Sequence, residues 1–224
     1  MLELREVWKG AKSKGKQRWM LAGANLAVPA GRRVALLGTD AADIRTVLHV
    51  LAGVEHPDSG SVRRVGLPCW PFGSSKFIDV AGTLRQNANF LSYIYGVDGG
   101  DVAAIATELS GVKLRKGRPL KRYPLSERRQ LALGLTLALQ FDWYFINQRL
   151  PRVAKGRVAQ IDGVIADRFS RAGVIWATTK PETVAGYCDA GLVLDQGALT
   201  FYDTLEAASE AYGKLTTGET SKRK

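Results

Sequence analysis

The chain has 224 residues, of which 46% are hydrophobic and 24% charged, a balance that is typical of folded globular proteins and excludes a disordered chain. Its longest apolar run, at 131–139, is far shorter than the roughly 20 residues that a membrane-spanning helix needs. The N-terminus shows no signal-peptide pattern, so we expect a cytoplasmic protein. Cys69 and Cys188 match neither a zinc spacing nor a redox pair, which predicts two buried, reduced thiols.

The charge balance is basic, with 32 Lys and Arg against 21 Asp and Glu and a formal net charge of +11. The basic residues cluster at 9–18, 113–129 and 149–157 and at the C-terminus. Clusters of this kind most often form a solvated basic face. Nucleic acid, anionic lipid headgroups and acidic polymers stay open as partners.

The hydrophobic pattern predicts alternating strands and helices. The first two expected strands form an antiparallel hairpin, whereas most later ones are short apolar runs typical of strands buried on both faces. The expected strands are 2–8, 19–28, 32–37, 61–65, 143–146, 173–177, 190–194 and 198–202. The expected helices are 43–53, 83–95, 99–110, one beginning near Pro124 or Ser126, 155–171 and 181–187. Buried strands that alternate with helices imply a parallel sheet, so the predicted fold class is α/β.

Several short segments carry a family resemblance. The most specific are Ala-Gly-Val-Glu-His-Pro-Asp-Ser-Gly at 52–60 and Cys-Trp-Pro-Phe-Gly at 69–73. Further matches are Arg-Gln-Asn-Ala-Asn-Phe at 85–90, Tyr-Ile-Tyr-Gly-Val at 93–97 and the segment around Tyr187-Cys188-Asp189. From residue 2 to about 210 the sequence resembles the ATP-binding subunits of ABC transporters, and among them those of capsular-polysaccharide exporters.

The resemblance implies one ABC-type domain at 1–215 with the P-loop NTPase fold. Its parallel sheet core, with an N-terminal antiparallel β subdomain, is expected at about 1–80 and 140–215. A helical lobe is expected at about 81–139, and 216–224 is expected to be a basic, flexible tail.

The phosphate loop of this family has the pattern Gly-x-x-x-x-Gly-Lys-Ser/Thr, in which glycine admits the phosphates, lysine neutralises them and the hydroxyl binds magnesium. Residues 38–46 keep only Gly38. The departures are Asp43 at the second glycine, Ile44 at the lysine and Arg45 at the hydroxyl, followed by Thr46. We expect Asp40 and Asp43 to cap the free amides of the next helix in place of a phosphate. Arg45 is an alternative cation, but it points about 100° away from the lysine direction.

The other motifs that the resemblance implies are replaced as well. Asn147 and Gln148 stand where the family has the Asp that holds magnesium and the Glu that activates water, and Thr179 stands at the switch histidine. The signature loop carries Pro124, Ser126 and Glu127 in place of residues that face the γ-phosphate. These replacements predict a catalytically degenerate subunit, a pseudo-ATPase with no catalytic residues, no metal site and no or very weak ATP binding.

The resemblance also implies the partners. We expect a membrane-spanning subunit of an ABC exporter, and pairing with a second copy or a related ATPase subunit, at the inner face of the cell membrane. Trp70, Phe72 and Phe77 are the expected docking residues. Two alternatives stay open, a weak or conditional ATPase of a heteromeric polysaccharide exporter and a basic module that binds nucleic acid or an acidic polymer. Nucleic acid is the less expected ligand because no recognition motif accompanies the charge.

Overall fold

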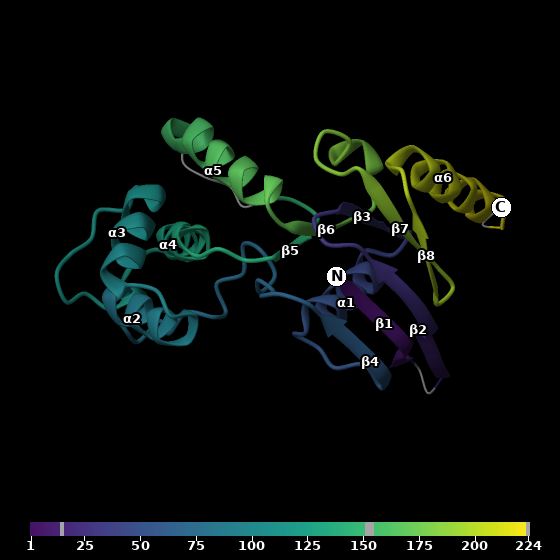
Figure 1. The fold of residues 1–224 in the computed structure, drawn as a ribbon, viewed down its shortest axis with the longest axis horizontal. Helices are drawn as coiled ribbons and strands as arrows, with labels where there is room; N and C mark the ends of the chain where they lie inside the picture. The colour runs from purple at the N-terminus through teal and green to yellow at the C-terminus, as the bar shows by residue number, and fades with distance from the viewer. Residues whose placement is uncertain (14–15, 151–154, 223–224) are drawn as a thin grey trace. The chain divides into compact units, whose positions relative to one another are not determined.

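Residues 1–13, 16–150 and 155–222 are described by the computed structural model, which Figure 1 draws as a ribbon. The chain divides into two compact units. Unit 1 contains Met1–Pro71, Asp142–Arg149 and Arg171–Lys224, and unit 2 contains Phe72–Phe141 and Leu150–Ser170. The basic cluster predicted at 149–157 lies partly outside the described residues.

Unit 1 begins with a three-stranded antiparallel sheet in the order β2-β1-β4, formed by β1 (Leu2–Ser13), β2 (Lys16–Val28) and β4 (Ser59–Arg64). The hairpin of β1 and β2 confirms the predicted antiparallel pair but is longer than expected. Residues 9–13 and 16–17, which the sequence predicted as part of a turn, continue the ladder, with Gly10 opposite Trp19 and Ser13 opposite Lys16. Neither segment contains a proline, so each of these residues has a backbone amide that it can contribute to the ladder.

The second sheet of unit 1 has the order β5-β6-β3-β7-β8. Its strands are β3 (Arg33–Leu37), β5 (Trp143–Asn147), β6 (Gly173–Thr178), β7 (Ala190–Asp195) and β8 (Ala198–Tyr202). The first four in the spatial order are parallel and β8 is antiparallel to β7. The apolar runs that the sequence predicted as buried strands form the parallel strands of this sheet. This confirms the α/β fold class.

Two helices cover opposite faces of this sheet. Leu36 and Leu192 share a hydrophobic core with Ile44 of α1 (Ala41–Ala52). Gly191 lies against Ala208 of α6 (Leu205–Lys222), and successive side chains of a strand point to opposite faces. The segment predicted as a helix at 181–187 contains only the single turn η3 (Pro181–Thr183).

α6 extends further than the sequence predicted. Residues 216–222, expected as a flexible tail, continue the helix, and residues 223–224 lie outside the described structure. No proline interrupts this stretch, so the backbone hydrogen bonds can continue. The hydroxyls of Thr216 and Thr217 donate to the carbonyl of Gly213 on the preceding turn, at 2.9 and 2.7 Å.

Unit 2 is helical. Its elements are α2 (Leu84–Tyr95), α3 (Gly99–Ser110), η1 (Leu120–Arg122), α4 (Leu125–Ala138), η2 (Lys155–Arg157) and α5 (Val158–Ser170). The close packing of α3 on α4 requires Gly134, because a Cβ there would lie 2.4 Å from the carbonyl oxygen of Ala106. None of the helices within the described residues is long and apolar enough to span a membrane.

α5 belongs to unit 2, although the sequence assigned residues 155–171 to the sheet core. The Arg157 guanidinium just before α5 donates to the carbonyl of Glu108 on α3 at 2.5 Å. Arg168 donates to the carbonyl of Leu137 on α4 at 3.1 Å. These bonds tie both ends of α5 to the other helices of this unit, which the helical periodicity alone could not indicate.

Candidate functional site

The residues of unit 1 that the sequence assigned to the nucleotide motifs meet at the carboxyl edge, the edge of the parallel sheet where β3, β5 and β6 end. Gly38 follows β3, Asn147 ends β5, and Thr179 follows β6. Because these strands are parallel neighbours, the loops after them lie at one edge. Tyr212 of α6 joins two of them, since its hydroxyl donates to the carbonyl of Thr179 at 3.0 Å and lies 3.5 Å from that of Gly38.

The start of α1 is satisfied by the protein's own carboxylates. Asp40 is the N-cap, and its carboxylate accepts from the amides of Ala42 at 2.7 Å and Asp43 at 3.2 Å. The capping predicted for Asp40 is therefore confirmed. Asp43 differs from the expectation, because its carboxylate accepts from both terminal nitrogens of Arg18 on β2, one of them at 2.6 Å. The first-turn amides of Ala42 and Asp43 and the charge of Arg18 are therefore bound to carboxylates of the chain itself, and not available to an incoming anion.

Ile44, at the position of the family's lysine, is fully buried in the core. It packs so closely under the loop that a Cβ on Gly38 would lie 2.5 Å from its Cγ2 atom. Arg45 is exposed, and the hydroxyl of Thr46 donates to the carbonyl of Ala42 at 3.1 Å within the helix. The lysine position thus contributes an apolar side chain that faces the core.

The end of β5 carries two neutral amides. Gln148 has a φ of 64°, in the left-handed region that non-glycine residues rarely adopt, and its backbone amide donates to Ala177 on β6 at 2.8 Å. The Oδ1 of Asn147 and the Nε2 of Gln148 are buried and have no hydrogen-bond partner among the described residues. No cluster of His, Cys, Asp or Glu that could hold a metal ion was found in the described part of the chain.

The signature residues belong to unit 2, at the start of α4. Pro124 is the N-cap, and within the described structure no side chain accepts a hydrogen bond from the first turn. Ser126 is exposed, and Glu127 lines a pocket with the basic loop that precedes the helix. Nothing in the sequence indicated this pocket beyond the count of basic residues.

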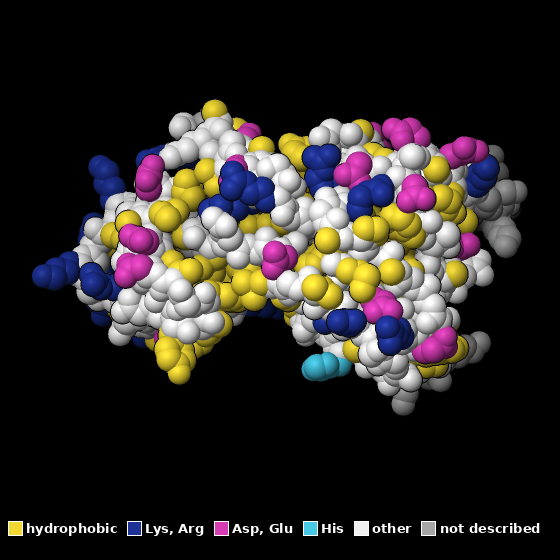
Figure 2. All heavy atoms as spheres, viewed as in Figure 1, with side chains coloured by type: hydrophobic (Ala, Val, Ile, Leu, Met, Phe, Trp, Pro, Cys, Tyr) yellow, Lys and Arg dark blue, Asp and Glu magenta, His cyan; other side chains and the backbone are white. Residues whose placement is uncertain are grey.

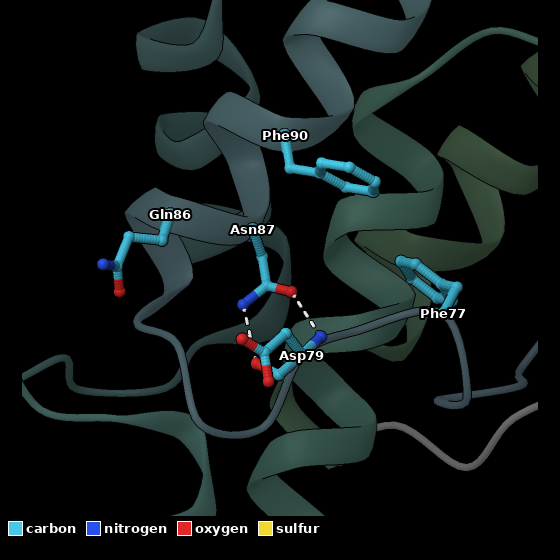
Figure 3. A pocket seen from close by; sticks show the side chains of 5 residues that line it. All are labelled: Phe77, Asp79, Gln86, Asn87 and Phe90. Atoms are coloured by element: carbon cyan, nitrogen blue, oxygen red, sulfur yellow. Dashed lines mark hydrogen bonds between the residues drawn. The ribbon is translucent and has the colours of Figure 1, made fainter.

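A second pocket of unit 2, about 310 Å³ in volume, lies between α2 and the loop before it (Figure 3). Phe77 and Phe90 line one side of it, and Gln86 points away from them (Figure 3). Asn87 fixes the loop, because its Oδ1 accepts from the amide of Asp79 at 2.7 Å and its Nδ2 donates to the Asp79 carbonyl at 2.9 Å. Aromatic side chains beside a few hydrogen-bonded polar groups, as in this pocket, are typical of ligand and peptide sites.

The three predicted docking residues have different environments. Phe77 lines the α2 pocket. Phe72 is only 6% exposed and packs edge-to-face on Phe169, with ring centroids 6.1 Å apart, so the expectation that it lies on the surface is wrong. Its neighbours Pro71 and Gly73 gave no sign that an aromatic ring in this loop points inward. Trp70 is half-buried and belongs to unit 1.

The sequence reading missed an apolar stripe on α2. Its members are Phe90, Tyr93 and Ile94, at 59%, 89% and 53% exposure, and the exposed Val97 follows just after the helix ends. The three helical residues have the i, i+3, i+4 spacing of one helix face, and a second, buried face of the same helix carries Leu84, Ala88 and Leu91. Figure 2 shows a group of hydrophobic side chains on the surface of unit 2 beside α2. The sequence of α2 has apolar residues on two faces, and only one face can pack on the core of the unit. This pattern could have predicted the exposed stripe.

Comparisons with known proteins agree with this architecture. No family model matches the chain. The capsule polysaccharide export ATP-binding protein CtrD of Neisseria meningitidis serogroup B is 26% identical over 216 residues, covering 96% of this chain and all of CtrD. The ATP-binding protein BexA of Haemophilus influenzae is 25% identical, and the polysialic acid transport ATP-binding protein KpsT of Escherichia coli 24% identical; each alignment covers 96% of this chain and 99% of the relative.

Solved structures match the fold at lower identity. The ADP- and phosphate-bound dimer of the ATP-binding cassette MJ0796 has a TM-score of 0.68 at 16% identity, covering 92% of this chain and 99% of that one. An ATP-binding subunit of an ABC transporter has a TM-score of 0.69 at 17% identity, covering 95% and 93%. The fold is therefore that of the ABC ATPase cassettes. The homologues of this chain include the ATP-binding proteins of a capsule polysaccharide export system and of a polysialic acid transport system.

Proposed function

We propose that this chain is a catalytically degenerate ABC subunit that docks on the membrane subunit of a polysaccharide exporter without turning over ATP. The observation that carries the proposal is the closed start of α1. Asp40 occupies the first-turn amides, Arg18 pairs with Asp43, and Ile44 is buried. A phosphate would meet two carboxylates there and no cation at the lysine position.

The residues at the ends of β5 and β6 support the same proposal. An amide oxygen such as Asn147 Oδ1 is uncharged and binds Mg²⁺ more weakly than a carboxylate, and the Gln148 amide cannot accept a proton from water. Thr179 offers no imidazole. The residues of this edge therefore do not fit Mg²⁺ and ATP, and we derive no catalytic step for them.

The nucleotide part of the proposal is tested by titration. We expect calorimetry with Mg-ATP to give no saturable heat in the micromolar range. The control is a double variant, Arg45→Ala with Arg149→Ala, which removes two exposed cations and should leave the result unchanged. Low-micromolar affinity would support the alternative of a weak or conditional ATPase instead.

The docking part rests on unit 2. ABC ATPase subunits normally pair with membrane subunits, and the exposed stripe on α2 next to the Phe77 pocket is the apolar surface that such a partner could cover. Monomeric proteins rarely keep contiguous exposed apolar side chains without a partner. Phe90 belongs to both the stripe and the pocket, so the docking residues we propose are Phe77, Phe90 and Tyr93 of unit 2. The buried Phe72 is removed from the set, and Trp70 belongs to unit 1 and is not part of this surface.

Co-purification in detergent with the membrane subunit of a capsule-type exporter from the same cell tests the docking. The double variant Phe90→Ser with Tyr93→Ser removes two exposed rings and should reduce retention at least tenfold. Val158→Ser, another exposed apolar residue of unit 2, is the matched control and should be retained like the wild type. Equal retention of all three proteins would refute docking through α2.

A further inference from the structure

The pocket beside the start of α4 is strongly basic. It has a volume of about 440 Å³ and is lined by Lys113, Arg115 and Arg118 of the loop after α3, by Tyr123, and by Glu127 of α4. Three cations and one carboxylate leave a formal excess of two positive charges. Figure 2 shows several Lys and Arg side chains on the surface of unit 2, and the lining cations of this pocket belong to the basic cluster at 113–129.

Arg118 is held in place but not satisfied. Its guanidinium carbon lies 5.0 Å from the centroid of the Tyr123 ring, and its Nη2 donates to the carbonyl of Arg122. Its Nε is buried and has no hydrogen-bond partner among the described residues. The ring contact and the hydrogen bond hold the guanidinium at the wall of the pocket, so Arg118 can meet an anion there with little loss of side-chain freedom.

Two other features add positive potential to the pocket. Pro124 begins α4 without a side-chain acceptor for the first-turn amides in the described structure, and helix starts attract anions. The loop itself is held to the helix start, because the backbone amide of Arg115 donates to the Tyr123 hydroxyl at 2.9 Å. The cations are thus carried on a loop that is tied down beside a positive helix end.

We propose that this pocket binds a phosphate dianion, either inorganic or as the monoester of a small molecule. The excess of two positive charges matches a dianion, and two guanidinium groups with one ammonium match an acceptor with three oxygens. The volume exceeds that of one phosphate, which leaves room for an organic group on the ester. This site stands on residues of unit 2 alone and does not depend on the proposed function.

Phosphorus NMR of the full chain, titrated with inorganic phosphate and in parallel with glycerol 1-phosphate, tests the site. Saturable binding that weakens as salt rises is expected, and tighter binding of the ester would assign the extra volume to its organic group. Lys113→Gln with Arg115→Gln, both exposed, should weaken binding at least tenfold without unfolding the chain. Glu127→Gln should tighten it severalfold, because it removes the opposing carboxylate.

The matched control is Lys76→Gln with Arg85→Gln, which removes the same charge from exposed positions of unit 2 outside the pocket. It should change the affinity less than twofold. Equal weakening by both double variants would show diffuse attraction to a basic protein and overturn the proposal. The absence of saturation with both phosphates, or weaker binding by Glu127→Gln, would overturn it as well.

Discussion

At the scale of single residues, the structure adds to what the sequence indicated about Ile44. The sequence predicted that Ile44 stands at the position of the family's lysine, and the structure adds that the side chain packs into the core beneath Gly38. Burial could be foreseen from the helical spacing of Ile44, Val47, Leu48 and Leu51. The partner of Asp43 could not, because Arg18 lies 25 residues earlier and an ion pair between distant segments leaves no local pattern.

Ile44→Lys should therefore destabilise the protein and not restore the phosphate loop. An ammonium at a fully buried position without a carboxylate partner costs about 3 kcal/mol or more of unfolding free energy. Urea denaturation measures the loss. Arg45→Lys, at an exposed position, is the control and should stay within about 0.5 kcal/mol of the wild type. A stable Ile44→Lys protein that binds Mg-ATP tightly would contradict this account.

At the scale of elements, α6 packs closely on the sheet at Gly191 of β7. A Cβ on Gly191 of β7 would lie 2.2 Å from the Cβ of Ala208, so this glycine permits the helix to pack on the sheet. The sequence predicted the strands at 190–194 and 198–202 and the α/β fold class. It predicted no helix after them, because residues 203–215 lack a strong apolar stripe. Similarly, the membership of α5 in unit 2 depends on hydrogen bonds from Arg157 and Arg168 to backbone carbonyls, which no periodicity reports.

Gly191→Ala is expected to lower the unfolding free energy by roughly 1–3 kcal/mol, because the added methyl group overpacks the contact with α6. Adding Ala208→Gly should recover part of the loss, although a glycine within a helix itself costs up to about 1 kcal/mol. Denaturant melts of the two single variants and the double variant complete the cycle. Purely additive effects would mean that the two positions do not touch.

The whole molecule keeps two buried thiols protonated, and its stability should therefore depend on alkaline pH. Burial raises the pKa of Cys188 from its ordinary 9.0 to about 12, and burial raises that of Cys69 well above 9.0. Above pH 9 the unfolded chain loses these protons while the folded chain keeps them. The thiols' contribution to the free energy of unfolding is therefore fully present below pH 9 and is lost as the pH rises toward 12. The loss is roughly 1.4 kcal/mol for each pH unit and for each thiol.

Cys69→Ala with Cys188→Ala gives the comparison, since other groups also titrate at high pH. The slope of unfolding free energy against pH between about 9 and 11 should be smaller for this variant than for the wild type. Equal slopes would mean that the thiols reach solvent in the native state.

Hydrolysis is also a property of the whole molecule, because it requires every motif at once. We expect no vanadate-sensitive ATP hydrolysis by the isolated chain. Gln148→Glu alone should not create it, since the start of α1 would still be closed by Asp40, Asp43 and Ile44. Phosphate release by the purified variant checks this. ATP hydrolysis by the Gln148→Glu variant would mean that nucleotide reaches the carboxyl edge of the sheet despite Asp40, Asp43 and Ile44.

The contacts at the start of α1 also limit which substitutions the chain can accept over generations. Glycine alone at 43 would leave Arg18 without its carboxylate, and lysine alone at 44 would bury a charge. Each first step toward Gly-x-x-x-x-Gly-Lys lowers stability before any phosphate site exists, so selection for folding opposes the change. Descendants of this sequence should drift further from the pattern at 38–46 while they keep the charge pair or replace both of its members together.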